Sequence, residues 1–120
     1  MTRVVCDPGI CGMPATIEVV RVSDPEVVEV GKRRVSLKVT CDCDRVTKMA
    51  CQLVELDEGE LEEWEPIKPR GEPKVCEYAR KFRFCAACPV PTAILKAMEV
   101  EAELALPKPA HIYFETTKQE

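Results

Sequence analysis

The sequence predicts a single α+β domain over residues 1–120. An antiparallel sheet of three or four strands carries a long C-terminal helix and one or two shorter helices on one face. Three observations support this prediction. β-Branched residues dominate the first third of the chain, and apolar and polar residues alternate at 33–40. Apolar residues then recur at helical spacing after residue 44, and again, more strongly, over residues 92–106.

The chain begins with a turn and then a β meander. Prolines and glycines surround the first two cysteines in the segment CDPGICGMP, so we expect an ordered turn with Cys11 at its tip. Strands are expected over residues 16–22, 26–30 and 33–40, where β-branched residues are frequent. They form an antiparallel meander with one packed face and one partly wet face.

The first helix is expected to begin at the end of this meander. Asp42 or Asp44 can cap it, and Cys43 then lies on or just before its first turn. An acidic, proline-rich surface excursion follows over residues 57–73, in which we expect solvated charges and a Trp64 side chain that packs onto the domain.

The last part of the chain predicts two more helices and one strand. A short helix is expected over residues 75–84, and the central helix over residues 92–106, where prolines precede a run of strong helix formers. Its polar stripe is narrow, which indicates burial on more than one side. Residues 110–115 alternate and predict a final edge strand.

Charge and hydropathy exclude several classes of protein. Seventeen Lys and Arg residues against 21 Asp and Glu residues give a net charge of −4, which argues against a nucleic-acid-binding protein. No apolar run approaches the roughly 20 residues of a membrane-spanning helix, and the first residues do not have the pattern of a secretion signal. We therefore expect a cytoplasmic protein that binds neither nucleic acid nor membranes.

Eight cysteines in 120 residues are the unusual feature of the composition. Two of them, Cys51 and Cys76, fall inside expected helices, where buried packing is the expected role. The other six fall at junctions between elements, where helix starts favour thiolates and loops can bend to a tetrahedral geometry. These six candidate metal ligands are Cys6, Cys11, Cys41, Cys43, Cys85 and Cys88.

The leading functional hypothesis is therefore a thiolate metal-binding protein that holds an iron–sulfur cluster or zinc. Cys11, Cys43 and Cys88 are the expected core ligands, Cys6 or Cys85 supplies a fourth, and Cys41 is held in reserve. His111 alternates with apolar residues in the last expected strand and is left out as a surface residue.

Other functional interpretations of the same residues stay open. Cys85 and Cys88 form a C-x2-C pair that could cycle as a thiol–disulfide oxidoreductase. The thiols could instead be inert or form disulfides, and the acidic segment around Trp64 could dock onto a partner. The two serines lack the sequence context of a catalytic triad, so we expect binding rather than hydrolysis.

Two resemblances accompany these residues. Cys11-Gly12, Cys43 at a helix start and Cys88 before the last helix resemble, in order and spacing, the IscU/NifU-like scaffold proteins for iron–sulfur cluster assembly. That resemblance implies an IscU/NifU-like fold with client or cluster-donor proteins as partners, although Met13 stands where the scaffold family has an aspartate. The segments CDPGICG and ACPVPTAILKA also resemble those of a small uncharacterised prokaryotic family.

Overall fold

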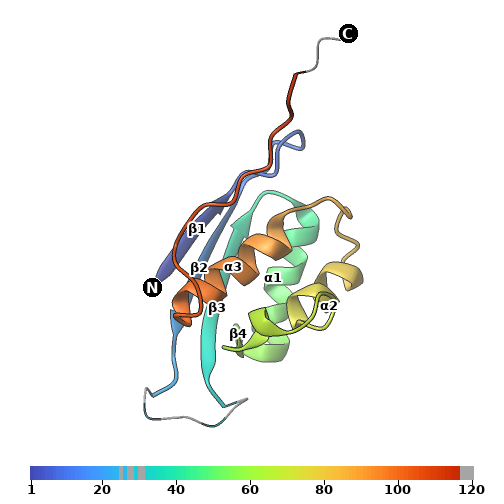
Figure 1. Cartoon of the computed structure of the whole chain (residues 1–120). Coiled ribbons are helices and arrows are strands. Elements are labelled where there is room, and N and C mark those ends of the chain that lie inside the picture. Colours follow the sequence, from blue (N-terminus) through green and yellow to red (C-terminus); the bar gives the residue numbers. More distant parts are fainter. Residues whose placement is uncertain (25, 27–28, 30–31, 117–120) are drawn as a thin grey trace.

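The computed structural model describes the whole chain except residues 25, 27–28, 30–31 and 117–120. In this described part, four strands and three α-helices form an α+β domain, with one 3-10 turn, η1, between the last strand and the second helix (Figure 1). In chain order the elements are β1 (Thr2–Cys6), β2 (Ala15–Arg21), β3 (Arg34–Cys41), α1 (Asp44–Asp57), β4 (Glu60–Glu62), η1 (Glu65–Ile67), α2 (Lys74–Lys81) and α3 (Val90–Glu101).

The sheet is antiparallel throughout and has the strand order β1-β2-β3-β4. Alternate residues of its two central strands are buried, so the sheet has one core face and one face open to solvent. The core face carries the largest buried side chains of the sheet, among them Ile17, Val19, Val35 and Leu37. This arrangement agrees with the packed and wet faces expected from the sequence.

Two helices cover the core face. α3 packs against β1 and β2, while α1 packs against β3 and β4 (Figure 1). α1 turns Val46, Met49 and Leu53 inward, at the spacing of one helical face. α3 contributes Ile94 and Met98, both with no exposed surface, and α2 closes the core beside it. No helix in the part of the chain that the structure describes is long and apolar enough to cross a membrane.

The strand predictions were correct for the middle of the sheet and wrong at its edges. Residues 16–22 and 33–40 correspond to β2 and β3. β1 was missed, because its five residues directly precede the proline-rich turn, and β4 was missed inside the acidic run. The strand expected over 110–115 was wrong, since these residues are exposed and have no strand partner. The strand expected over 26–30 lies largely outside the described residues.

The helix predictions were correct in number and differ at the ends. Cys43 is the N-cap residue of α1, as expected, but neither Asp42 nor Asp44 caps it with a side-chain hydrogen bond. α3 runs over Val90–Glu101 rather than 92–106, because Glu103 adopts a left-handed backbone conformation that ends the helix.

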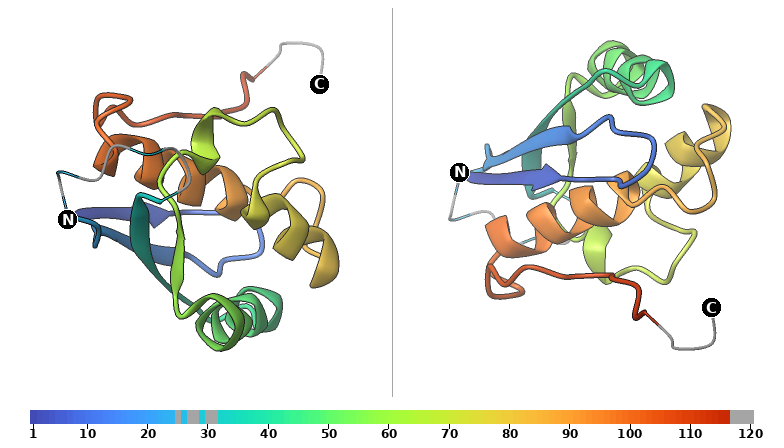
Figure 2. Two further views of the ribbon diagram at one scale, coloured as in Figure 1. Left: turned by 90° about the horizontal axis from the view of Figure 1, so that it is seen from below. Right: turned by 90° about the horizontal axis from the view of Figure 1, so that it is seen from above.

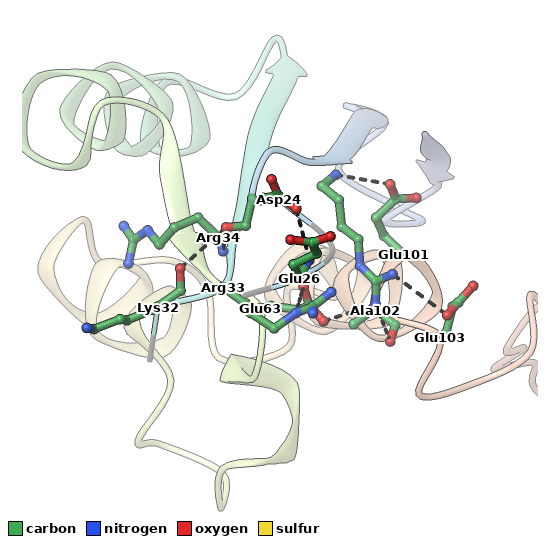
Figure 3. A network of polar contacts seen from close by, with 11 residues as sticks. Asp24, Glu26, Lys32, Arg33, Arg34, Glu63, Glu101, Ala102 and Glu103 are labelled. Atoms are coloured by element: carbon green, nitrogen blue, oxygen red, sulfur yellow. Dashed lines mark hydrogen bonds and ion pairs between the residues drawn. The ribbon is translucent and has the colours of Figure 1, made fainter. Parts of the chain in front are cut away.

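The acidic segment after α1 is not simply solvated, since two of its carboxylates are buried. Glu63 is only 4% exposed and accepts hydrogen bonds from Arg21 at 3.0 Å and Arg33 at 3.1 Å. Arg21 also donates to the carbonyl of Ala102 at the end of α3, so this network ties β2, β3, β4 and α3 together (Figure 3). Glu65 is buried as well and pairs with Lys68 at 2.9 Å.

A second carboxylate fixes α3 on the sheet. Glu101, the last residue of α3, accepts a hydrogen bond from the Thr2 hydroxyl at 2.7 Å and one from the backbone N–H of Arg21 at 3.1 Å. Burial raises the pKa of Glu101, but these hydrogen bonds lower it by more, so the pKa lies below its ordinary value of 4.5. The charged carboxylate is therefore the form that joins β1, β2 and α3.

Glu63→Gln should destabilise the fold by about 2 kcal/mol, because two arginines lose their shared carboxylate. Removing one partner of a fully buried pair costs roughly 3–5 kcal/mol, and the partial exposure of Arg21 reduces that cost. Urea unfolding monitored by circular dichroism measures the difference. The matched control is Glu103→Gln, which removes an 83% exposed partner of the same Arg21 and should cost below roughly 0.5 kcal/mol. Equal effects of the two substitutions would contradict this account of the network.

Glu101→Gln should flatten the acid dependence of stability. Because the folded-state pKa of Glu101 is lowered, its contribution is complete above 4.5 and is lost as the pH falls through the folded-state value. The free energy of unfolding of the unmodified protein should thus fall more steeply below that pH than that of the variant. Urea titrations repeated at several acidic pH values test this, and parallel curves for the two proteins would contradict it.

Candidate thiol site

The six junction cysteines lie toward one end of the domain. β1 ends at Cys6, β3 ends at Cys41, Cys43 precedes α1, and the loop with Cys85 and Cys88 leads into α3. These three junctions lie toward the upper end of the molecule in Figure 1, where the connection between β1 and β2, which contains Cys11, is also found. Segments that are far apart in the sequence therefore meet at one place.

Sheet register explains why the first and middle cysteines meet. Cys6 lies opposite Ala15 in the pairing of β1 with β2, and Ala15 lies opposite Cys41 in the pairing of β2 with β3. The three residues thus form one row across the sheet and share its core face. Since neighbouring strands are roughly 4.8 Å apart, the backbones at Cys6 and Cys41 are separated by about 10 Å, with only a small alanine side chain between them.

The thiols fall into an inner and an outer group. Cys6 is buried, and three half-buried thiols pack against the same core. The outer thiols, Cys11 and Cys85, are exposed. Cys11 is held out by a tight turn in which the N–H of Gly12 donates to the carbonyl of Gly9 at 2.9 Å, with a positive φ at both glycines. The inner group consists of Cys6, Cys41, Cys43 and Cys88.

Three of the six sulfurs accept hydrogen bonds from N–H groups. The backbone N–H of Cys43 donates to the Cys41 sulfur at 3.5 Å, and the backbone N–H of Val90 donates to that of Cys88. The Arg45 guanidinium donates to the Cys85 sulfur at 3.4 Å from the first turn of α1. These donors lie at two of the three junctions, before α1 and before α3. The Cys41 thiol also donates to the carbonyl of Met13 at 3.4 Å.

The inner thiols also act on one another electrostatically. Burial raises the pKa of Cys6, and the nearby charges of Cys88, Asp7, Cys41 and Cys11 raise it further. Burial likewise raises the pKa of Cys88, against which the hydrogen bond from Val90 acts in the opposite direction. Ionisation of one of these thiols therefore opposes ionisation of its neighbours, and a cation between them would reduce that effect.

The sulfurs approach one another without forming a closed ligand shell. Among the described residues, no three Cys, His, Asp or Glu side chains are close enough together to hold a metal ion. All eight cysteines are free thiols. Metal coordination at this end would therefore require the sulfurs to move closer together.

The other sequence predictions near this site have mixed outcomes. Buried packing was wrong for Cys51, whose side chain is exposed on α1, and Cys76 is half-buried. Trp64 is half-buried beside η1, in agreement with packing onto the domain, and His111 is exposed. Arg45 was missed by sequence reasoning. Its position two residues after Cys43, in the first turn of an expected helix, is the signal that could have identified it.

Comparison with known proteins gives one match. Residues 2–114 match the model of a family of unknown function, DUF6951. No curated protein and no solved structure matches the chain. The likeness to IscU/NifU-like scaffolds accordingly stays a prediction from the sequence, while the expectation of an uncharacterised family is confirmed.

The burial of the thiols predicts their order of reaction with a maleimide under native, reducing conditions. Cys11, Cys51 and Cys85 are exposed and should be modified first, whereas Cys6 should be modified last, because it is buried and its pKa is raised. Mass spectrometry of proteolytic peptides over time gives the order. In denaturant all eight should react at similar rates, and a native Cys6 that reacts as fast as Cys11 would contradict the structure of the site.

Proposed function

The chain belongs to the DUF6951 family of unknown function, and we propose that it is a thiolate metal-binding protein that holds zinc or an iron–sulfur cluster. The observation that carries this proposal is the convergence of six thiols from three distant segments at one end of the domain. Packing alone does not require such a gathering, because small apolar residues would fill the same positions without mutual repulsion.

The chemistry of these thiols also favours a soft metal. Tetrahedral sulfur sites select zinc or iron–sulfur clusters, and both require deprotonated cysteines. N–H groups donate to the sulfurs of Cys41, Cys85 and Cys88, and such hydrogen bonds are the usual surroundings of metal-bound thiolates. Burial, and to a smaller extent the neighbouring thiols, raise the pKa of Cys6 and Cys88, and a bound cation would act against both effects.

We assign the core ligands to Cys11, Cys43 and Cys88, with Cys6 or Cys85 as the fourth ligand and Cys41 in reserve. One ligand from each junction lets the metal link the β1–β2 turn, the start of α1 and the start of α3. Metal binding would then stabilise the fold by joining elements that the sheet alone does not connect.

The chemistry of the thiols also bears on the cellular compartment in which the protein acts. Free thiols keep their reactivity only in a reducing compartment, so we propose that the protein acts in the cytoplasm. If the ligand is an iron–sulfur cluster, the exposed Cys11 and Cys85 would be the thiols nearest a client or cluster-donor protein.

The test is the metal content of variants purified without oxygen. Cys43→Ala and Cys88→Ala should each lose the metal and lower the thermal stability. The expected loss of affinity exceeds the roughly 10–100-fold that removal of an outer hydrogen-bond partner of a ligand usually causes. Elemental analysis gives the metal and its stoichiometry, and visible absorption identifies a cluster. Cobalt substitution reports the number of thiolates at a zinc site.

The matched control is Cys51→Ala, which removes an exposed thiol from α1, the same helix that Cys43 caps. It should leave the metal content unchanged. Loss of metal in this control alone, or metal-free protein after anaerobic purification and reconstitution with zinc and with iron and sulfide, would refute the proposal.

A second candidate function is thiol–disulfide exchange, which the contact between Arg45 and Cys85 favours. In such a reaction the Cys85 thiolate attacks a substrate disulfide and releases one thiol. Cys88 then displaces the second thiol, so that the enzyme pair is oxidised and the substrate is reduced. Against this candidate, a redox C-x2-C pair usually follows a parallel strand directly, whereas here the pair follows α2. Reduction of a small disulfide that Cys85→Ala abolishes and Cys43→Ala retains would favour this alternative.

A further inference from the structure

A groove between β3 and α1 lies beside the thiol site, with Cys41 lining both. It has a volume of about 490 Å³ and is lined mainly by apolar side chains, among them Val39 of β3 and Ala50 and Val54 of α1. Val54 is 62% exposed, whereas Val46, Met49 and Leu53 of the same helix are buried. This is a volume within the range of pockets that bind apolar ligands or peptide side chains.

One wall of this groove is an incompletely paired strand edge. β4 pairs with β3 only over Arg34–Ser36, and Gly59 then accepts one further hydrogen bond, from the N–H of Leu37, at 2.8 Å. Backbone groups two residues apart point to the same side of a strand, so those of Val39 and Cys41 also point into the groove. The carbonyl of Cys41 is occupied by the Thr47 hydroxyl. At Val39 the described part of β3 has no strand partner on this side.

The same chain carries an extended segment of matching character. Residues 110–115 are exposed throughout, with exposed fractions of 92% at Ile112, 78% at Tyr113 and 96% at Phe114. Soluble proteins rarely leave three successive large apolar residues in water without a partner surface. The family match extends to residue 114, so this segment belongs to the length that the family shares.

The segment and the groove lie on opposite sides of one molecule. In both views of Figure 2, α3 and the strands lie between α1 and the red C-terminal segment. Figure 1 shows this segment leaving the domain beyond the connection between β1 and β2, away from α1. A segment placed in this way is available to the groove of another molecule rather than to its own.

Within the described part of the chain, the edge of β3 lacks a strand partner at Val39, and the apolar segment 110–115 lacks a partner surface. From these two features we propose that the chain forms a two-fold dimer, in which residues 110–115 of each copy add as a strand to β3 of the other. In an added strand, Ile112 and Phe114 share one face and can fill the groove beside Ala50 and Val54, while Tyr113 points to the opposite side. Backbone hydrogen bonds to Val39 complete the edge, as in other cases of β-strand addition. A reciprocal exchange closes at two copies, whereas a one-way exchange from copy to copy would continue into a fibre.

The test is the oligomeric state of the full chain, measured by sedimentation velocity over a wide range of concentration. A reductant and a chelator exclude dimers made by disulfides or by a shared metal, so the outcome is independent of the proposed metal site. We expect a dimer. Val54→Glu in the groove, and separately Ile112→Ser with Phe114→Ser in the segment, should each raise its dissociation constant by roughly tenfold or more.

The matched control is Leu56→Glu, which introduces the same charge on α1 at a residue that is 63% exposed and lies outside the groove. It should change the dissociation constant by no more than about twofold. Circular dichroism checks that all variants keep their fold, which is expected because each substituted side chain is exposed. A photo-crosslinking amino acid in place of Tyr113 should attach to β3 of the other copy.

Three results would overturn the proposal. The first is a chain that stays monomeric at all concentrations. The second is a dimer that survives both the groove and the segment variants, or that Leu56→Glu disrupts as strongly as Val54→Glu. The third is a crosslink from residue 113 to the edge strand β1 or to α3, which would place the segment on another surface.

Discussion

The site depends on the antiparallel pairing of β1, β2 and β3. The register that places Cys6, Ala15 and Cys41 in one row determines where β1 and β3 end on the core face. A shift of one residue in either pairing would turn the cysteine of that strand toward solvent, because side chains alternate across a sheet. The proximity of the first and middle thiols is therefore a consequence of the hydrophobic pattern of the strands. The same Ile17 and Val19 that build the core also fix the thiols.

The junctions could be predicted from the sequence, whereas the distances between sulfurs could not. The helix start at Cys43 and the proline-marked start of α3 are local signals, and both agree with the structure. The register of β1 on β2 is a long-range property, and β1 itself was missed because its residues directly precede a turn. Cys51 was misplaced for a related reason. Helical spacing puts it next to the apolar face of α1, but only tertiary packing determines how far that face extends.

The burial of charged residues was the property predicted least well from the sequence, for a physical reason. Six acidic residues among the nine at 57–65 are typical of a solvated surface, and burial of Glu63 depends on Arg21, the last residue of β2, and Arg33, which directly precedes β3. Composition does not reveal such pairing, since it counts charges without their neighbours. The network has a clear effect on the fold. It holds the short β4 against β3 and reaches the end of α3 through Ala102, so β3, which ends at Cys41, is fixed at its opposite end as well.

The proposed thiol site and the proposed dimer contact meet at the end of β3. The Cys41 sulfur belongs to the inner thiols, while its carbonyl lies at the groove. The Thr47 hydroxyl shares its one proton between the carbonyls of Cys41 and Cys43. A strand added beside Val39 would restrict the motion of this segment, and restricted motion lowers the entropic cost of bringing ligands together. Linkage requires the converse: a metal that orders Cys41 and Cys43 would strengthen docking of the segment by the same factor. The two proposals can fail separately, but if both hold, metal affinity and dimer affinity are one coupled property of the β3–α1 junction.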